Sequence, residues 1–250
     1  MTSEHIWSRW IGELYSDFNG GYTFQLGVDP DIKVDRQWLS PKIDMTAKVV
    51  CAECNNGWMS DLDGEAKATM KDMILYAAPL SLLPRGIGTI TAFALKTAVV
   101  ADFVSPNRLP FFSPLERKRF AEKLVIPQAV NVSLAFFVTT NVASGLSGNF
   151  TNHYAKIAGA RHKGFELYVF TFVAGFLVVQ LTTCRWLSRI IKRPAYFPVL
   201  RQRAVWDKAC IPIWPSDGKA VEWPPTVYFE SDSIKNIVNR WNNLIDTPTT

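Results

Sequence analysis

Cysteines are few in this sequence of 250 residues, and long apolar runs are missing. Four cysteines are too few for a scaffold built from disulfide bonds. The most apolar stretch, residues 167–181, is shorter than the roughly 20 residues of a membrane-spanning helix, and its valines and phenylalanines favour two buried strands. The first residues show no basic segment followed by an apolar one. We therefore expect a cytoplasmic protein with no secretion signal and no membrane partner.

Glycine and proline are not in excess either, at 14 and 15 residues, so the chain is neither collagen-like nor linker-like. Hydrophobic residues make up 48% of the sequence, which is enough for a substantial core and excludes wholesale disorder. The length allows one large domain or two small ones.

Positive charge is distributed unevenly along the chain. The net charge is +5. Residues 1–110 have 10 basic and 13 acidic residues, a net charge of −3, whereas residues 111–250 have 17 basic and 9 acidic residues, a net charge of +8. Such an excess is typical of a phosphate-binding surface, although a solvated basic face is the ordinary alternative. We take the basic residues of the densest segment as candidate nucleic-acid contacts: Arg185, Arg189, Lys192, Arg193, Arg201 and Arg203.

Hydrophobic periodicity and turn residues predict an α+β protein. Residues 1–77 carry the motifs, and residues 78–250 hold helices followed by a mainly antiparallel β region. The predicted helices cover residues 6–15, 58–76, 89–104, 115–124 and 231–245. The predicted strands cover residues 22–28, 47–50, 130–139, 149–158, 165–172 and 176–183, with hairpin loops at 145–148 and 159–164.

Three short motifs contain the residue types that carry chemistry. Glu4 and His5 form an acid–histidine pair, Cys51 and Cys54 form a C-x-x-C pair, and Asn55 follows directly. Taken alone, a C-x-x-C pair indicates either metal binding or redox chemistry, and an acid–histidine pair can simply be solvated. The remaining cysteines, at positions 184 and 210, are expected to be buried free thiols.

In this order the motifs resemble the HNH endonuclease superfamily, the ββα-metal nucleases. The strings EHIWSRWIG and CAECNNGWMSDLD are similar to those of bacterial HNH-type proteins, over roughly residues 3–75. The resemblance implies a ββα-metal module within residues 1–77. It implies His5 as general base, Glu4 and Asn55 as ligands of Mg²⁺ or a similar divalent cation, and Cys51 and Cys54 as half of a structural Zn²⁺ site.

The implied activity is metal-dependent hydrolysis of phosphodiester bonds, in DNA. Two features depart from the family pattern. Zinc-containing members carry a second C-x-x-C before the acid–histidine pair, and no such pair precedes Glu4 here. Trp58 stands where other members often have His, Lys or Glu. The nearby acids Asp61 and Asp63 could substitute, but their spacing differs from the family pattern. The alternatives are a degenerate HNH-like protein that binds nucleic acid without cutting it, and an interaction domain with no nucleic-acid partner.

Overall fold

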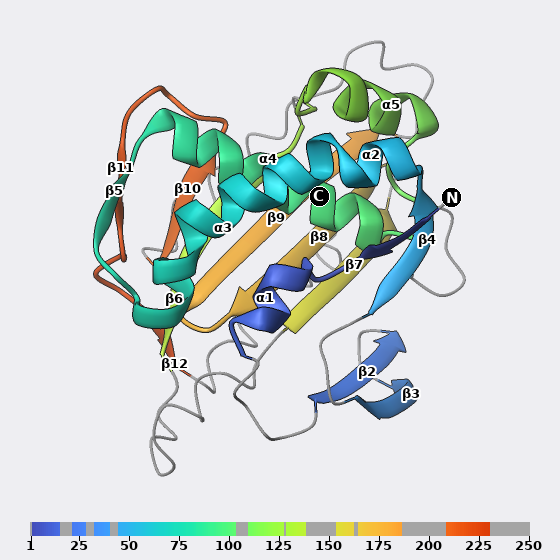
Figure 1. Ribbon diagram of the computed structural model, residues 1–250, viewed down its shortest axis with the longest axis horizontal. Coiled ribbons are helices and arrows are strands. Elements are labelled where there is room, and N and C mark those ends of the chain that lie inside the picture. Colours follow the sequence, from blue (N-terminus) through green and yellow to red (C-terminus); the bar gives the residue numbers. More distant parts are fainter. Residues whose placement is uncertain are drawn as a thin grey trace.

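The computed structural model describes residues 2–15, 22–28, 33–40, 45–103, 110–127, 129–138, 154–162, 165–186 and 209–230, with only the backbone at 22–28, 33–40, 154–162, 165–167 and 185–186. It is a mixed structure in which helices cover one face of a large sheet, so the α+β prediction is confirmed (Figure 1). The predicted helix at 231–245 and the predicted loop at 145–148 lie outside the described residues.

The large sheet has the order β10-β6-β9-β8-β7, and these neighbours are antiparallel. Its strands are β6 (Asn131–Val138), β7 (Tyr154–His162), β8 (Phe165–Ala174), β9 (Leu177–Trp186) and β10 (Cys210–Trp214), with β12 (Phe229–Glu230) added parallel to β6. The apolar stretch 167–181 forms most of β8 and β9, as predicted, because both strands are buried on both faces. Gly175 and Phe176 form the two-residue turn between them.

Helix α3 (Trp58–Tyr76) has the predicted bounds. Its buried side chains recur at helical spacing, as expected for one apolar face: Met59, Leu62, Ala66, Met70, Met73 and Ile74. The helix ends at Ala77, which has the left-handed conformation common after helix C-termini.

Helix α4 (Pro84–Ala101) lies between α3 and the sheet and is buried almost all round (Figure 1). The sequence-based start at residue 89 was wrong by one turn and a half. Pro84 is compatible with the first helical position, where its missing N–H is not needed. The glycines at 86 and 88 do not break the helix, because its packing outweighs their propensity.

The remaining helices are α1 (Arg9–Glu13), α2 (Ala52–Asn56) and α5 (Pro114–Lys123). Ser113 and Glu116 cap α5 reciprocally, as the predicted start at this serine required. Three two-stranded pairs complete the fold: β1 (Thr2–His5) with β4 (Thr46–Val50), β2 (Tyr22–Val28) with β3 (Lys33–Ser40), and β5 (Leu80–Leu82) with β11 (Val221–Trp223).

Several strand predictions differ from the structure. The predicted strand residues 149–153 lie outside the described residues, and Gly159, predicted to lie in a loop, lies inside β7. Its partner β8 supplies a continuous ladder opposite this glycine, so pairing overrides the local turn signal. Strands β3 and β5 were not predicted, because each is defined mainly by its partner strand.

One hydrophobic cluster extends from Ile6 to Trp223 and contains side chains of α1, α3, α4 and the large sheet. Residues from 1–77 and from 78–250 therefore share a core. Within the described ranges, no helix combines the length and the apolar character needed to cross a bilayer.

Candidate functional site

The N-terminal strand brings the three motifs to one corner of the molecule. Strand β1 pairs antiparallel with β4, with His5 opposite Thr46 and Thr2 opposite Val50. The chain then passes from Val50 directly into Cys51 and α2. As a result, the acid–histidine pair and the C-x-x-C-N segment, about fifty residues apart in sequence, lie next to each other.

Asn55 ties α2 to β1. Its Nδ2 donates to the Ser3 carbonyl at 3.3 Å and lies 3.4 Å from Thr2 Oγ1. Thr2 Oγ1 in turn donates to the carbonyl of Val50 at 3.2 Å. Because the amide nitrogen makes these bonds, the amide oxygen of Asn55 is the end left for another donor or a cation.

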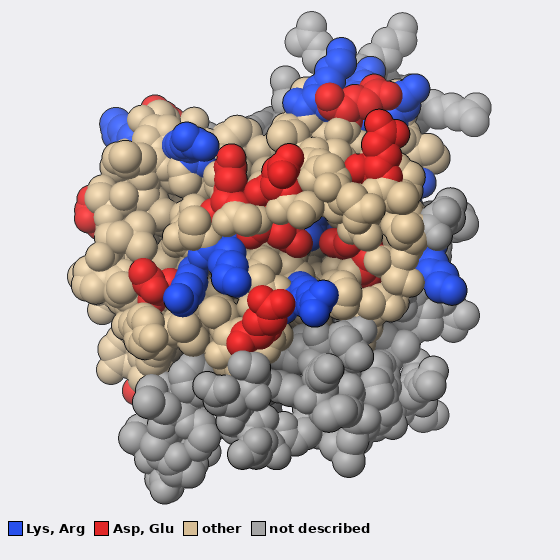
Figure 2. All heavy atoms as spheres, in the orientation of Figure 1, with Lys and Arg blue, Asp and Glu red and all other residues tan. Residues whose placement is uncertain are grey.

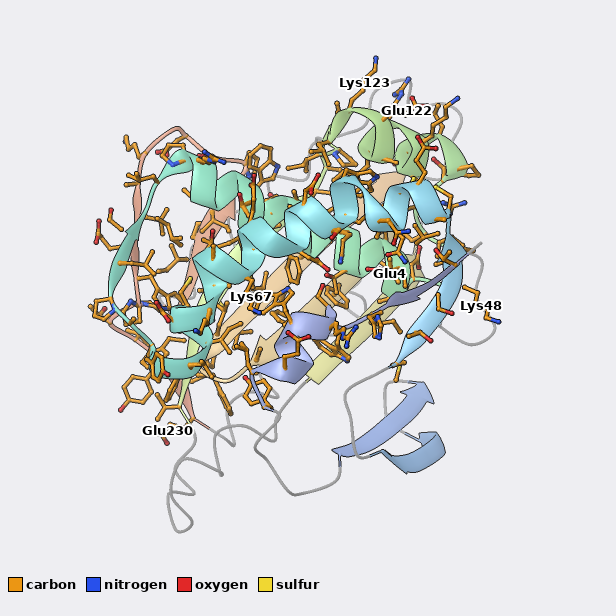
Figure 3. The ribbon with its side chains drawn as sticks, in the orientation of Figure 1. Glu4, Lys48, Lys67, Glu122, Lys123 and Glu230 are labelled. Carbon is orange, nitrogen blue, oxygen red and sulfur yellow. The ribbon has the colours of Figure 1, made fainter. Side chains whose placement is uncertain are left out.

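Glu4 and His5 differ in environment, because consecutive residues of a strand point to opposite faces. The Glu4 side chain points into the protein and the residue is only 5% exposed (Figure 3). The His5 side chain is half-buried, and no hydrogen bond to its imidazole is found in the part of the chain that the structure describes. The pair that the sequence presents as one motif is thus divided between two faces of β1.

A buried lysine is the hydrogen-bond donor to Glu4. Lys96 of α4 is 1% exposed, and its Nζ donates to Glu4 Oε1 at 3.1 Å, Ser8 Oγ at 3.0 Å and Asp63 Oδ1 at 2.7 Å. Ser8 Oγ donates to the same Asp63 oxygen at 2.9 Å. These four residues are called the Lys96 cluster below. The three ammonium protons have three acceptors, so the buried cation is fully satisfied.

Lys96 was not predicted from the sequence, and Asp63 was considered only as one of two nearby acids that could substitute for the family residue replaced by Trp58. A signal for Lys96 was present, because it is the one charged residue within the otherwise apolar or neutral run 86–101. A charge in a helix that is buried all round requires a buried partner. Asp63 lies between Leu62 and Ala66 at the spacing of the buried face of α3, whereas Asp61 is exposed. Which acid would meet the lysine depends on how α3 packs on α4.

Cys51 caps the N-terminus of α2, and its Sγ accepts a hydrogen bond from the Cys54 backbone N–H at 3.1 Å. The hydrogen bond from the Cys54 side chain, followed by this backbone bond, lowers the pKa of the exposed Cys51 thiol. The same thiol–thiol bond, together with partial burial, raises the pKa of Cys54. Two thiols on one helical turn have the donor chemistry of half a zinc site. Among the described residues, no three His, Cys, Asp or Glu side chains gather as a metal-binding group.

An apolar cavity of about 240 Å³ adjoins the cysteine pair, between β4, α2 and the start of α3 on one side and α4 and α5 on the other. Trp58 and Met59 line it, and the Trp58 ring meets Phe120 edge-on at 5.4 Å between centroids. Met59 is 3% exposed. The tryptophan that departs from the family pattern therefore packs α3 against α5.

The four cysteines should divide into two reactive and two unreactive thiols. Cys51 is exposed and Cys54 half-buried, while Cys184 and Cys210 are buried, as predicted. Burial raises the pKa of Cys184 to about 11, so its thiol stays protonated and inaccessible at pH 8. In metal-free native protein, Ellman's reagent should react with the thiols of 51 and 54 only, and with all four in guanidinium chloride. Rapid native reaction of Cys184, located by mass spectrometry, would contradict this.

The predicted nucleic-acid contacts Arg189, Lys192, Arg193, Arg201 and Arg203 lie outside the described residues. Arg185 lies in β9, with its backbone opposite Glu166 of β8. Among the described residues, helix α5 carries four basic side chains: Arg117, Lys118, Arg119 and Lys123. Figure 2 shows these basic side chains over α5 together with the acidic side chains of the same helix.

The chain was compared with protein-family models, curated proteins and solved structures. No family model, curated protein or solved structure matches this chain. The resemblance to HNH nucleases therefore depends on the motif residues, and the activity that it implies is a proposal.

Proposed function

We propose that this protein is a metal-dependent phosphodiester hydrolase of the HNH type that acts on DNA. The observation that supports this most is the antiparallel pairing of β1 with β4, followed by α2 and α3. This order of two strands and a helix joins the acid–histidine pair to the C-x-x-C-N segment, and the Asn55 side chain is hydrogen-bonded to the backbone of Ser3 beside Glu4.

The residues of the corner have donor chemistry suited to a divalent cation. The carboxylate of Glu4 and the amide oxygen of Asn55 are hard oxygen ligands of the kind that Mg²⁺ prefers. The Lys96 cluster holds two carboxylates and one ammonium, which leaves an excess negative charge for a cation. When bound, the ion would stabilise negative charge on the scissile phosphate.

In this proposal His5 is the general base. A neutral imidazole can accept the proton of an attacking water. Because His5 lies on the face of β1 opposite Glu4, the proposal requires the attacking water to lie at the edge of the strand, within hydrogen-bond reach of the imidazole. Asn55 orients α2 against β1, and the cysteine pair lies at the junction of β4 and α2 as half of a zinc site.

Replacing His5 by alanine tests the proposal. We expect His5→Ala to lower the rate of plasmid DNA cleavage in Mg²⁺ by at least about 100-fold, the usual contribution of a general base, and to leave the thermal unfolding temperature unchanged. Thr46→Ala, which alters the residue opposite His5 in the strand pair, is the control and should cleave normally. Undiminished cleavage by purified His5→Ala protein would exclude His5 as the base.

Helix α5 offers described residues that could contact the DNA backbone. It packs against α3 beside the cysteine pair, and Arg119 and Lys123 are exposed and one helical turn apart. The double substitution Arg119→Ala/Lys123→Ala should weaken DNA binding about equally for unrelated sequences. It should reduce the slope of log K against log salt concentration by about 2, since each phosphate contact contributes about 0.9. Fluorescence anisotropy at several salt concentrations measures both the DNA affinity and its salt dependence. An unchanged slope of log K against log salt concentration would exclude α5 from the interface.

Binding without hydrolysis is a second candidate, favoured by the engagement of Glu4 with Lys96. A carboxylate already paired with an ammonium is a weaker ligand for a second cation. Under this alternative, DNA binding persists with its salt dependence and no divalent metal supports His5-dependent cleavage. The His5→Ala experiment, run with Mg²⁺ and with Mn²⁺, separates the two candidates.

A further inference from the structure

The charges of the Lys96 cluster do not balance. Glu4, Asp63 and Lys96 come from β1, α3 and α4, and they bring two negative charges and one positive charge together. The Glu4 and Lys96 side chains are 7% and 1% exposed, and that of Asp63 is 24% exposed. An excess charge in such a site is costly unless a counter-ion compensates it.

The three partners of the ammonium are not equivalent. Lys96 Nζ lies 2.7 Å from Asp63 Oδ1 and 3.1 Å from Glu4 Oε1. Ser8 reinforces the closer pair, because its hydroxyl accepts from Lys96 and donates to Asp63. The other oxygen of Glu4, Oε2, accepts no hydrogen bond within the described residues. Lys96 is thus paired mainly with Asp63, and the uncompensated charge remains with Glu4.

We infer that Asp63 and Lys96 are positioning residues that set the charge at Glu4 for a divalent cation. Lys96 keeps the two carboxylates together in the cation-free protein. Asp63 cancels the charge of Lys96, so that Glu4 retains its own charge for the cation. This inference rests on the proposed function, in which Glu4 is a cation ligand.

The test measures Mn²⁺ binding to the full chain by electron paramagnetic resonance, without nucleic acid. Asp63→Asn removes one negative charge but keeps an oxygen that can accept from Lys96, so folding should persist, as circular dichroism will verify. We expect its dissociation constant for Mn²⁺ to rise at least about tenfold. Asp61→Asn is the matched control, because this acid lies two residues away on the exposed face of α3, and its affinity should equal that of the wild type.

Lys96→Met should have the opposite effect from Asp63→Asn. The Lys96→Met substitution leaves two carboxylates without a counter-ion, so Mn²⁺ should bind this variant at least as tightly as it binds the wild type. Mn²⁺ should also raise the unfolding temperature of the variant by more than it raises that of the wild type. Lys96→Gln, which is also neutral but retains hydrogen-bond donors, is the second variant should the methionine variant not fold. A merely structural role would weaken binding in the Asp63 and Lys96 variants alike.

The outcomes separate this inference from the proposed function. If the Glu4→Gln variant binds Mn²⁺ as the wild type does, Glu4 is not a cation ligand, and both this inference and the proposed function are wrong. If Glu4→Gln loses binding while Asp63→Asn matches Asp61→Asn, this inference alone is overturned. Parallel weakening in Asp63→Asn and the neutral Lys96 variants also overturns it. Opposite shifts in these variants, with binding lost in Glu4→Gln, support it.

Discussion

Replacing Lys96 by methionine is expected to lower the free energy of unfolding by about 3–5 kcal/mol in buffer free of divalent ions. The ammonium is fully buried and is the only cation within hydrogen-bond reach of Glu4 and Asp63 among the residues that the structure describes. Methionine preserves most of the side-chain volume, so the loss comes from the two carboxylates left without their partner. Denaturation in urea, followed by circular dichroism in the presence of EDTA, measures this loss in the free energy of unfolding.

An exposed lysine on the neighbouring helix is the matched control. Lys67 of α3 is labelled in Figure 3. It forms an ion pair with Glu13 at 3.6 Å, and the two side chains are 44% and 54% exposed. Because solvent and salt screen such pairs, Lys67→Met should change stability by less than about 1 kcal/mol. If Lys96→Met is no more destabilising than Lys67→Met, the buried charges are not coupled as the structure indicates.

A double variant identifies the source of the loss. Adding Glu4→Gln to Lys96→Met removes one of the two unpaired charges, so part of the lost stability should return. The difference between the double variant and the sum of the single variants gives the coupling energy of the pair. An additive result would mean that Lys96 stabilises the protein by packing alone.

Replacing Gly175 by alanine is the second substitution with a large expected effect, about 3 kcal/mol or more of destabilisation. Gly175 has φ +52° in the turn between β8 and β9. A Cβ at this position would fall well inside van der Waals contact with the carbonyl oxygen of Ile74. That oxygen accepts the Phe176 backbone N–H at 3.1 Å, so the turn and the end of α3 cannot separate without losing a hydrogen bond.

Gly218 provides the control for backbone strain alone. It also has a positive φ, of +81°, but a Cβ there would meet no atom within 4 Å. Gly218→Ala should therefore cost only about 1–2 kcal/mol, the strain of a left-handed residue. Urea denaturation of both variants compares the two costs. Equal losses would show that the turn can move away from α3, contrary to the close approach of Gly175 to the Ile74 carbonyl.

Local patterns in the sequence were sufficient for several elements. The bounds of α3 and its buried residues were predicted because an amphipathic helix repeats its apolar residues every three to four positions. The serine cap and the following proline likewise located the start of α5. The two buried strands β8 and β9 followed from an apolar stretch interrupted by a glycine. In each case the signal lies within about twenty residues of chain.

The candidate site depended more on tertiary structure. The sequence alone determined which residue types are present, that the chain folds as an α+β protein, and which motifs could carry metal or phosphate chemistry. It could not divide Glu4 from His5, nor join Glu4 to Lys96, which is 92 residues away. Those contacts depend on the packing of β1, α3 and α4 around a shared core. The burial of a charge and the choice of its partner are decided by that packing, because no local pattern encodes which distant side chain will supply the opposite charge.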